Sequence, residues 1–258
     1  MAADEAIATI TGQEEWPPTV RVYGWRPAAI SIGYSQRARK TVNVEKCVQL
    51  GIPLVRRLTG GRAVFHDEEV TYSVIARKGH LGSGDSVLET YRRIGQALVS
   101  SLERLGIRAH LRRMASGGIG QVAAHGLPPC FSSTGRYEVM VGGRKVVGSA
   151  QRWIGGVVLQ HGSLLTGEGH LQIAHFLPHG DGVDTKNIVQ ELRKKTTSLG
   201  ALLSRRVSYA EVVSVLFCGF QEAYQVLLEP GQLRPEERSL ARRLVQERYG
   251  RQEWTLRK

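Results

Sequence analysis

The feature that most constrains the fold is a pair of β-type runs joined by two consecutive glycines. Residues 136–141 and 144–148 flank Gly142-Gly143, and both runs are rich in valine. Strand-type runs separated by two glycines are typical of a hairpin, because glycine adopts the positive φ that such a turn needs. The sequence therefore predicts an antiparallel hairpin here. Cys130 precedes this hairpin, and Lys145 lies near the start of its second strand.

Further strands and helices are interspersed along the chain without βαβ regularity. We expect strands at residues 20–24, 29–33, 53–57, 70–75, 107–111 and 156–165, and helices at 2–8, 44–50, 86–105, 208–227 and 235–249. The helices from Ser86 and Ser208 each begin with a serine followed three residues later by glutamate, the pattern of a capping box. Residues 166–204 read as loops and small helices, with a short helical piece at 171–177. The sequence predicts one α+β domain over residues 1–258, with 208–258 as its C-terminal helical segment.

Composition limits the compartment and the chemistry. The chain has 258 residues, of which 41% are hydrophobic, and no apolar run approaches the length of a membrane span. Its N-terminus carries acids where a signal peptide needs basic residues, so we expect a cytoplasmic protein without membrane attachment. Cys47, Cys130 and Cys218 are too far apart for a C-x-x-C metal site or a disulfide framework. Reduced thiols and no metal are expected.

The net charge of +12 predicts attraction to an acidic partner. Nucleic acid, an anionic membrane surface and an acidic protein all satisfy that requirement. The basic residues are spread along the chain, and no signature of a zinc finger, homeodomain or RNA-recognition motif accompanies them. A basic nucleic-acid-binding module remains an alternative, and we expect no nucleic-acid partner.

Gly60-Gly61 lies between two predicted strands and is flanked by Arg56, Arg57 and Arg62. Glycine allows a backbone to approach a ligand closely, and arginines offer cationic donors. A hairpin turn with solvated arginines explains the same residues. Both interpretations stay open on this stretch alone. The glycine-rich residues 114–129 predict a second loop that is mobile or shaped by a ligand.

Cys130 and Lys145 are candidates for a nucleophile and its activating cation. A thiol has a pKa of about 8.5, and a fixed ammonium nearby favours the reactive thiolate. The alternatives are a small buried cysteine and a solvated hairpin lysine. Cys47 and Cys218 fall on predicted helices, where packing is the expected role.

Three motifs, in order, carry a resemblance to a known family. They are Arg56-Arg57-Leu58-Thr59-Gly60-Gly61-Arg62-Ala63-Val64-Phe65-His66-Asp67, Gly143-Arg144-Lys145-Val146-Val147-Gly148-Ser149-Ala150-Gln151, and Leu159-Gln160-His161-Gly162-Ser163. Together they resemble the biotin/lipoate protein ligase superfamily, over nearly the whole chain. The Thr-Gly-Gly-Arg-Ala form, combined with Cys130, is most similar to the LipM-type octanoyltransferase branch.

The resemblance implies a mixed, mostly antiparallel sheet flanked by helices, and a two-step acyl transfer. An octanoyl group would pass from acyl carrier protein to Cys130 as a thioester, with Lys145 lowering the pKa of the thiol. It would then pass to a lysine of a lipoyl-domain protein, such as glycine cleavage H protein or a 2-oxoacid dehydrogenase E2. The residues implied to line the acyl cleft are Arg57, Thr59, Gly60, Gly61, Ala63, His66, Gly148, Ser149, Ala150 and His161.

Alternatives remain within and outside this family. An ATP-dependent lipoate-protein ligase on the same fold would activate a free acid and would need no cysteine. Thioester-to-amide transfer runs downhill, so the octanoyltransferase route implies no cofactor. His66 and His161 could carry the proton of the attacking amine or could simply hydrogen-bond backbone. We expect the protein to be a monomer.

Overall fold

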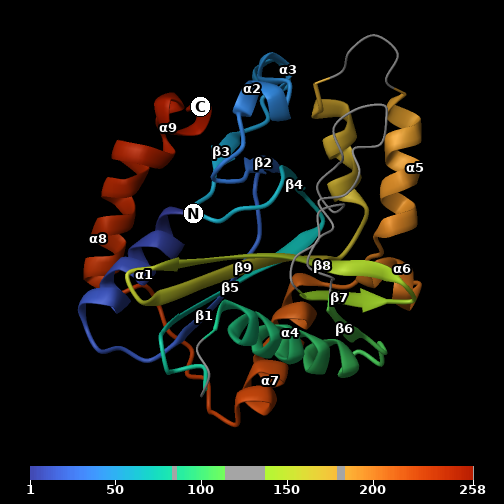
Figure 1. Ribbon diagram of the computed structural model, residues 1–258. Helices are drawn as coiled ribbons and strands as arrows, with labels where there is room; N and C mark the ends of the chain where they lie inside the picture. The colour runs from blue at the N-terminus through green and yellow to red at the C-terminus, as the bar shows by residue number, and fades with distance from the viewer. Residues whose placement is uncertain (83–85, 114–136, 179–183, 258) are drawn as a thin grey trace.

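The computed structural model describes residues 1–82, 86–113, 137–178 and 184–257, which form two sheets flanked by helices (Figure 1). The larger sheet holds, in spatial order, β1 (Thr19–Tyr23), β5 (Glu69–Arg77), β9 (Val157–Leu165), β8 (Arg144–Ile154), β7 (Tyr137–Val141) and β6 (His110–Arg113). The smaller sheet holds β3 (Leu54–Arg56), β2 (Ala29–Ile32) and β4 (Val64–His66). Among the described strands, every pairing is antiparallel except that of β2 with β3. The predicted α+β class with a mostly antiparallel sheet is confirmed.

Glycine pairs make both tight turns in the centre of the larger sheet. Gly142 and Gly143 have φ of +55° and +76°, which confirms the predicted hairpin between β7 and β8. Gly155 and Gly156, with φ of +52° and +82°, join β8 to β9 in the same way. Strand β8 therefore runs to Ile154, well past the predicted end at residue 148. Residues 149–154 pair with β9, and the local sequence pattern did not predict this part of the strand.

The segment containing Gly60-Gly61 is not a hairpin turn. Strands β3 and β4 do not pair with each other, because β2 lies between them and pairs with both. Residues 57–63 therefore cross one end of β2, where the backbone amide of Tyr34 donates to the carbonyl of Thr59 at 2.9 Å. The strands predicted at residues 53–57 and 70–75 correspond to β3 and β5, but β4 between them was not predicted, and the hairpin interpretation is wrong.

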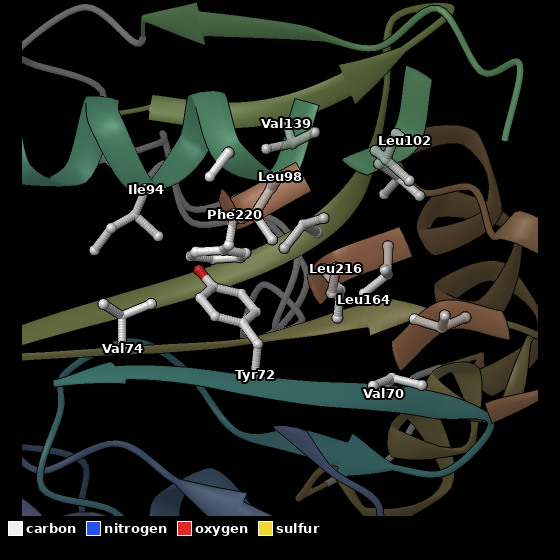
Figure 2. Packing of buried hydrophobic residues seen from close by; sticks show 14 of the residues in the cluster. Val70, Tyr72, Val74, Ile94, Leu98, Leu102, Val139, Leu164, Leu216 and Phe220 are labelled. Carbon is white, nitrogen blue, oxygen red and sulfur yellow. The ribbon is translucent and has the colours of Figure 1, made fainter. Parts of the chain in front are cut away.

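Helices α4 (Val87–Glu103) and α7 (Tyr209–Tyr224) pack together on one face of the larger sheet (Figure 1). Ser86 and Ser208 cap them by accepting from the backbone amides three residues later, as predicted. Figure 2 shows the resulting core, in which side chains of both helices meet those of β5. Its labelled members include Val70, Tyr72, Val74, Ile94, Leu98, Leu102, Leu216 and Phe220.

The opposite face carries the two ends of the chain. Helix α1 (Ala2–Gln13) packs on β5 and β9, with α8 (Pro235–Leu244) beside it. The π-helical turn η3 (Val245–Tyr249) and α9 (Gln252–Leu256) continue toward β3. The short helices α2 (Ala38–Thr41) and α3 (Val44–Gln49) lie next to the smaller sheet (Figure 1).

Residues 166–204 are more helical than predicted. The expected short piece is the 3₁₀ helix η2 (Gly169–Phe176), and α6 (Leu199–Leu203) is a second small helix. Helix α5 (Thr185–Lys195) was not predicted as a full helix. It is strongly polar, and its apolar Ile188, Val189 and Leu192 pack on the hydrophobic cluster of the smaller sheet. Packing against residues distant in the sequence therefore stabilises α5, whose own composition does not clearly predict a helix.

Among the described residues, no helix combines the length and the apolar character needed to cross a membrane.

Candidate active site

A cavity of about 460 Å³ lies where the glycine segment meets β8 and β9. The predicted residues on its wall are Arg57, Gly60, Gly61, His66, Lys145, Gly148, Ser149, Ala150 and His161. Thr59 and Ala63 were predicted for the same cleft but do not line it. Thr59 is fully buried, and Ala63 belongs to the hydrophobic cluster of the smaller sheet. The fold thus brings most of the three sequence motifs to one cavity.

A β-bulge turns Lys145 toward this cavity. Val139 pairs with Val147 and the adjacent Met140 pairs with Lys145, so Val146 has no counterpart on β7. Val146 and Val147 both join the core beneath α4 and α7, whereas Lys145 lines the cavity. Without the extra residue, strict alternation would place Lys145 on the same face as Val147.

Lys145 is held by a buried ion pair. Its Nζ lies 2.8 Å from Oε1 of Glu138 on β7, and each side chain is only 8% exposed. The backbone carbonyl of Lys145 accepts from the amide of Thr197 at 2.9 Å. Charges this deeply buried are stable only when they are paired, so Glu138 fixes both the charge and the position of the ammonium.

Arg57 clamps the glycine segment. Its Nη2 donates to the carbonyls of Gly60 at 2.9 Å and Arg62 at 2.6 Å, while Nη1 donates to Ser31. Gly61 has φ of +91°, a conformation that favours glycine. Arg57 was predicted to line the substrate cleft, and it does lie on the cavity wall. Its described hydrogen bonds hold the backbone of the glycine segment in place.

Thr59 and His161 form a buried pair at the cavity, with His161 on its wall and Thr59 behind it. Thr59 Oγ1 lies 2.5 Å from His161 Nε2, and His161 Nδ1 has no hydrogen-bond partner within the described ranges. Burial lowers the pKa of His161 to about 3. The ring is therefore neutral at pH 7.

His66 makes a different set of contacts. Its Nδ1 lies 2.9 Å from Oε1 of Glu69, and its Nε2 lies 2.7 Å from Oγ of Ser31. Thr71 and Ser163 also donate to the same Glu69 oxygen, at 2.7 and 2.8 Å. A carboxylate only accepts, so Nδ1 of His66 donates to it, and in the neutral ring Nε2 accepts from the Ser31 hydroxyl.

Tyrosines support the strand at the cavity edge. The hydroxyl of Tyr91 donates to the Ser149 carbonyl at 2.8 Å, and the Tyr72 hydroxyl lies 2.7 Å from Ser149 Oγ. Burial raises the pKa of Tyr72 to about 12, so it remains a neutral phenol. The carbonyl and the hydroxyl of Ser149 are thus engaged within the protein.

Sequence reasoning missed Ser31, Glu69 and Tyr91. A signal for Glu69 was present, because Glu69, Thr71 and Ser73 are polar at every second position of a strand that is otherwise apolar. Such alternation in a buried strand marks a polar face that needs partners. Ser31 and Tyr91 carried no comparable local signal.

Cys130 lies outside the described residues, as do the predicted loop at residues 114–129 and the first residue of the predicted hairpin. Its assignment as nucleophile stays a prediction. The described part of the site consists of the cavity, Lys145 with Glu138, and the two histidine networks.

The sequence model described as "Lipoyl protein ligase A/B catalytic domain" matches residues 1–221. Among curated proteins, "Octanoyltransferase LipM" of Symbiobacterium thermophilum is 40% identical over 265 residues, covering 100% of this chain and 93% of the relative. The protein of the same name from Kyrpidia tusciae is 42% identical over 258 residues, with coverage of 100% and 94%. Among solved structures, a bipartite lipoate protein ligase of Thermoplasma acidophilum is similar with a TM-score of 0.78 and 25% identity, covering 99% of this chain and 89% of that one. The chain therefore belongs to the lipoyl protein ligase A/B catalytic domain family.

Proposed function

We propose that this chain is an octanoyltransferase that moves an octanoyl group from acyl carrier protein, through a thioester on Cys130, to a lysine of a lipoyl-domain protein. Octanoyl transfer is supported by full-length relatives that carry this activity in their names, at 40% and 42% identity. The observation that carries the mechanism is the buried ammonium of Lys145, held by Glu138 on the wall of a cavity made by the three motifs.

The cavity supplies room for the acyl chain. Gly60, Gly61, Gly148 and Ala150 have no large side chains, and all four lie on its wall. Burying an extended hydrocarbon chain there contributes about 0.8 kcal/mol for each methylene. Small residues on the wall therefore support an acyl substrate.

In the first step, the Cys130 thiolate attacks the thioester carbonyl of octanoyl-acyl carrier protein, and the carrier thiolate leaves. The Lys145 ammonium favours the attacking thiolate because opposite charges attract strongly in a poorly solvated site. In the second step, an acceptor lysine attacks the enzyme thioester, forming an amide and releasing Cys130. Thioester exchange is nearly balanced and amide formation is favourable, so the route needs no ATP.

Mass spectrometry of the Cys130 peptide tests this function. After incubation with octanoyl-acyl carrier protein, the unchanged protein should carry an octanoyl adduct on Cys130, and Cys130→Ser should carry none. Cys218→Ser is the matched control, because Cys218 is half-buried on α7 and takes no part in the cavity. It should form the adduct normally. Unimpaired transfer by Cys130→Ser would exclude the thioester route.

An ATP-dependent lipoate-protein ligase is the second candidate, favoured by the structural similarity to the Thermoplasma acidophilum ligase. That reaction would release pyrophosphate from ATP in the presence of magnesium and a free acid. It would also persist in Cys130→Ser. Pyrophosphate release measured on both proteins therefore separates the two candidates.

A further inference from the structure

A directional chain of hydrogen bonds ends at the cavity. Arg57 Nη1 donates to Ser31 Oγ at 3.0 Å, Ser31 lies 2.7 Å from His66 Nε2, and His66 Nδ1 lies 2.9 Å from Glu69. The guanidinium only donates and the carboxylate only accepts, so in the neutral state of His66 its Nδ1 carries the proton and its Nε2 accepts. The Ser31 hydroxyl therefore donates to His66, which donates to Glu69. Ser31 and His66 both line the cavity.

Glu69 is equipped to stabilise a positive charge on His66. Its side chain is 1% exposed, and Oε1 accepts from His66, Thr71 and Ser163. Its Oε2 is buried and has no hydrogen-bond partner within the described ranges. A carboxylate in such a poorly solvated position interacts strongly with a neighbouring imidazolium.

Trp25 covers the ring of His66. The two rings stack with centroids 4.1 Å apart and an interplanar angle of 12°. The indole Nε1 of Trp25 donates to Thr71 Oγ1 at 2.8 Å, and Thr71 donates to Glu69. The orientation of His66 is thus fixed by stacking on its face and by hydrogen bonds at both nitrogens, as general-base catalysis requires.

We propose that Ser31 and His66 carry away the proton that the acceptor lysine loses when it attacks the acyl-thioester, and that Glu69 positions His66 for this step. The inference rests on the proposed octanoyl transfer and assigns its second step. Ser31 is the group that meets the amine, because both nitrogens of His66 are already bonded.

The proton and bond changes balance within the site. The neutral amine nitrogen attacks the acyl carbon, so a C–N bond forms and the C–S bond to Cys130 breaks. The nitrogen gives one proton to Ser31 Oγ while the hydroxyl hydrogen of Ser31 moves to His66 Nε2. His66 becomes an imidazolium paired with Glu69, and the cysteine leaves as a thiolate. The imidazolium later returns its proton to the thiolate or to solvent, which restores the starting state.

His161 lines the same cavity but lacks these features. Within the part of the chain that the structure describes, no carboxylate hydrogen-bonds to its ring, and its Nε2 is occupied by Thr59. Burial, the largest cause, lowers the pKa of His161 to about 3, so taking up a proton there is unfavourable. The charged or titratable groups that the described structure places around His66 are Glu69 at Nδ1, Arg57 beyond Ser31, and His161.

The test separates the two half-reactions. Acyl-enzyme formation from octanoyl-acyl carrier protein is followed by mass spectrometry, and transfer from the isolated acyl-enzyme to a lipoyl domain is followed by quenched flow. His66→Gln and Glu69→Gln should still form the acyl-enzyme, but should transfer it at least about 100-fold more slowly, the lower end of the usual contribution of a general base. His110→Gln, on the exposed surface of β6, is the matched control and should be unchanged in both steps.

Ser31→Ala provides the second variant. It removes the hydroxyl that meets the amine but keeps His66 and Glu69, so it should also slow transfer while the acyl-enzyme accumulates. Transfer at the unchanged rate in any of the three variants would overturn the inference. Equal loss of both steps would also overturn it, because that result indicates a purely structural role. Failure of the wild-type protein to form any acyl-enzyme would instead refute the proposed function.

Discussion

Arg56 and Trp254 bond to each other twice, each side chain donating to the other's backbone carbonyl. Arg56 Nε lies 3.1 Å from the Trp254 carbonyl, and Trp254 Nε1 lies 3.0 Å from the Arg56 carbonyl. Arg56 also donates to the carbonyls of Gly33, Tyr34, Gln36, Thr255 and Arg257. One fully buried guanidinium therefore joins the last helix of the chain to the segment that follows β2.

Arg56→Lys should destabilise the protein by at least about 3 kcal/mol, because a single ammonium cannot serve carbonyls on two segments and the buried acceptors lose their donors. Chemical denaturation measures the change. Arg39→Lys is the control, since the ion pair of Arg39 with Glu45 is about two-thirds exposed and should contribute little. An Arg56→Lys protein as stable as Arg39→Lys would show that the C-terminal helix is not anchored through Arg56.

The pair of Lys145 with Glu138 predicts a specific double-mutant result. Glu138→Gln removes the carboxylate from this buried ion pair, so it should lower the free energy of unfolding by about 3 kcal/mol. Replacing both residues, as Glu138→Leu with Lys145→Met, should restore stability because no charge remains buried. The double variant should nevertheless form no acyl-enzyme, because it lacks the ammonium that favours the Cys130 thiolate. Recovery of activity together with stability would contradict the role proposed for Lys145.

Local patterns predicted the parts of the fold that depend on neighbouring residues. The β7–β8 hairpin followed from Gly142-Gly143, and the caps of α4 and α7 followed from Ser86 and Ser208. These signals work because turn and cap geometry is decided within a few residues. The motif resemblance also brought together most residues of the cavity wall.

Nonlocal pairing decided what the sequence did not predict. The glycine segment crosses β2 because β2 inserts between β3 and β4, and no pattern near Gly60 reveals that insertion. The direction of Lys145 depends on the bulge at Val146, which arises only in the pairing with β7. Ser31 joins the site through a partner that is 35 residues away.

His161 predicts that stability falls in mild acid. Its folded pKa is lowered to about 3 by burial, whereas an exposed histidine has a pKa near 6.5. Below pH 6.5 the unfolded chain therefore binds a proton that the folded chain does not, and stability is lost as the pH falls. Each pH unit costs about 1.4 kcal/mol, so the loss at pH 5 is about 2 kcal/mol from this residue.

Urea denaturation between pH 5 and 7 checks this dependence. His161→Gln should make the curve less steep, because it removes one histidine whose protonation the folded state resists, while His170, whose pKa burial lowers to about 4, keeps part of the slope. His110→Gln on exposed β6 should keep the slope of the unchanged protein. Equal slopes for the unchanged protein and His161→Gln would show that other groups control the acid response.

Asp4 should add to the acid sensitivity at lower pH. Its buried carboxylate accepts from Arg21, Tyr23 and Ser73. Burial alone raises the pKa of Asp4, but the amino terminus, Arg21 and His161 outweigh it, so the pKa lies below its ordinary value. Its contribution to stability is therefore present above the ordinary aspartate range and is lost as the pH falls through the folded pKa. Asp4→Asn should remove this lower part of the acid transition, measured by denaturation below pH 5. An unchanged transition would contradict it.

Alanine substitutions at two glycines near the cavity should differ in their effect on stability. A Cβ on Gly33 would lie 2.0 Å from the carbonyl oxygen of Gly61, and Arg57 holds that segment in place. Gly33→Ala should therefore destabilise the protein by about 1–3 kcal/mol, as overpacking does. A Cβ on Gly60 meets no atom of the described residues within 4 Å, so Gly60→Ala should change stability by no more than about 0.5 kcal/mol.

Gly60→Ala should instead change which acyl chain is accepted. Gly60 lies on the cavity wall, so the added methyl group takes space that the acyl chain would use. Rates of acyl-enzyme formation from octanoyl- and hexanoyl-acyl carrier protein measure this directly, with thermal unfolding as the check on the fold. The variant should lose more rate with the octanoyl donor than with the hexanoyl donor. An unchanged ratio of the two rates, in a protein of normal stability, would mean that the acyl chain does not reach Gly60.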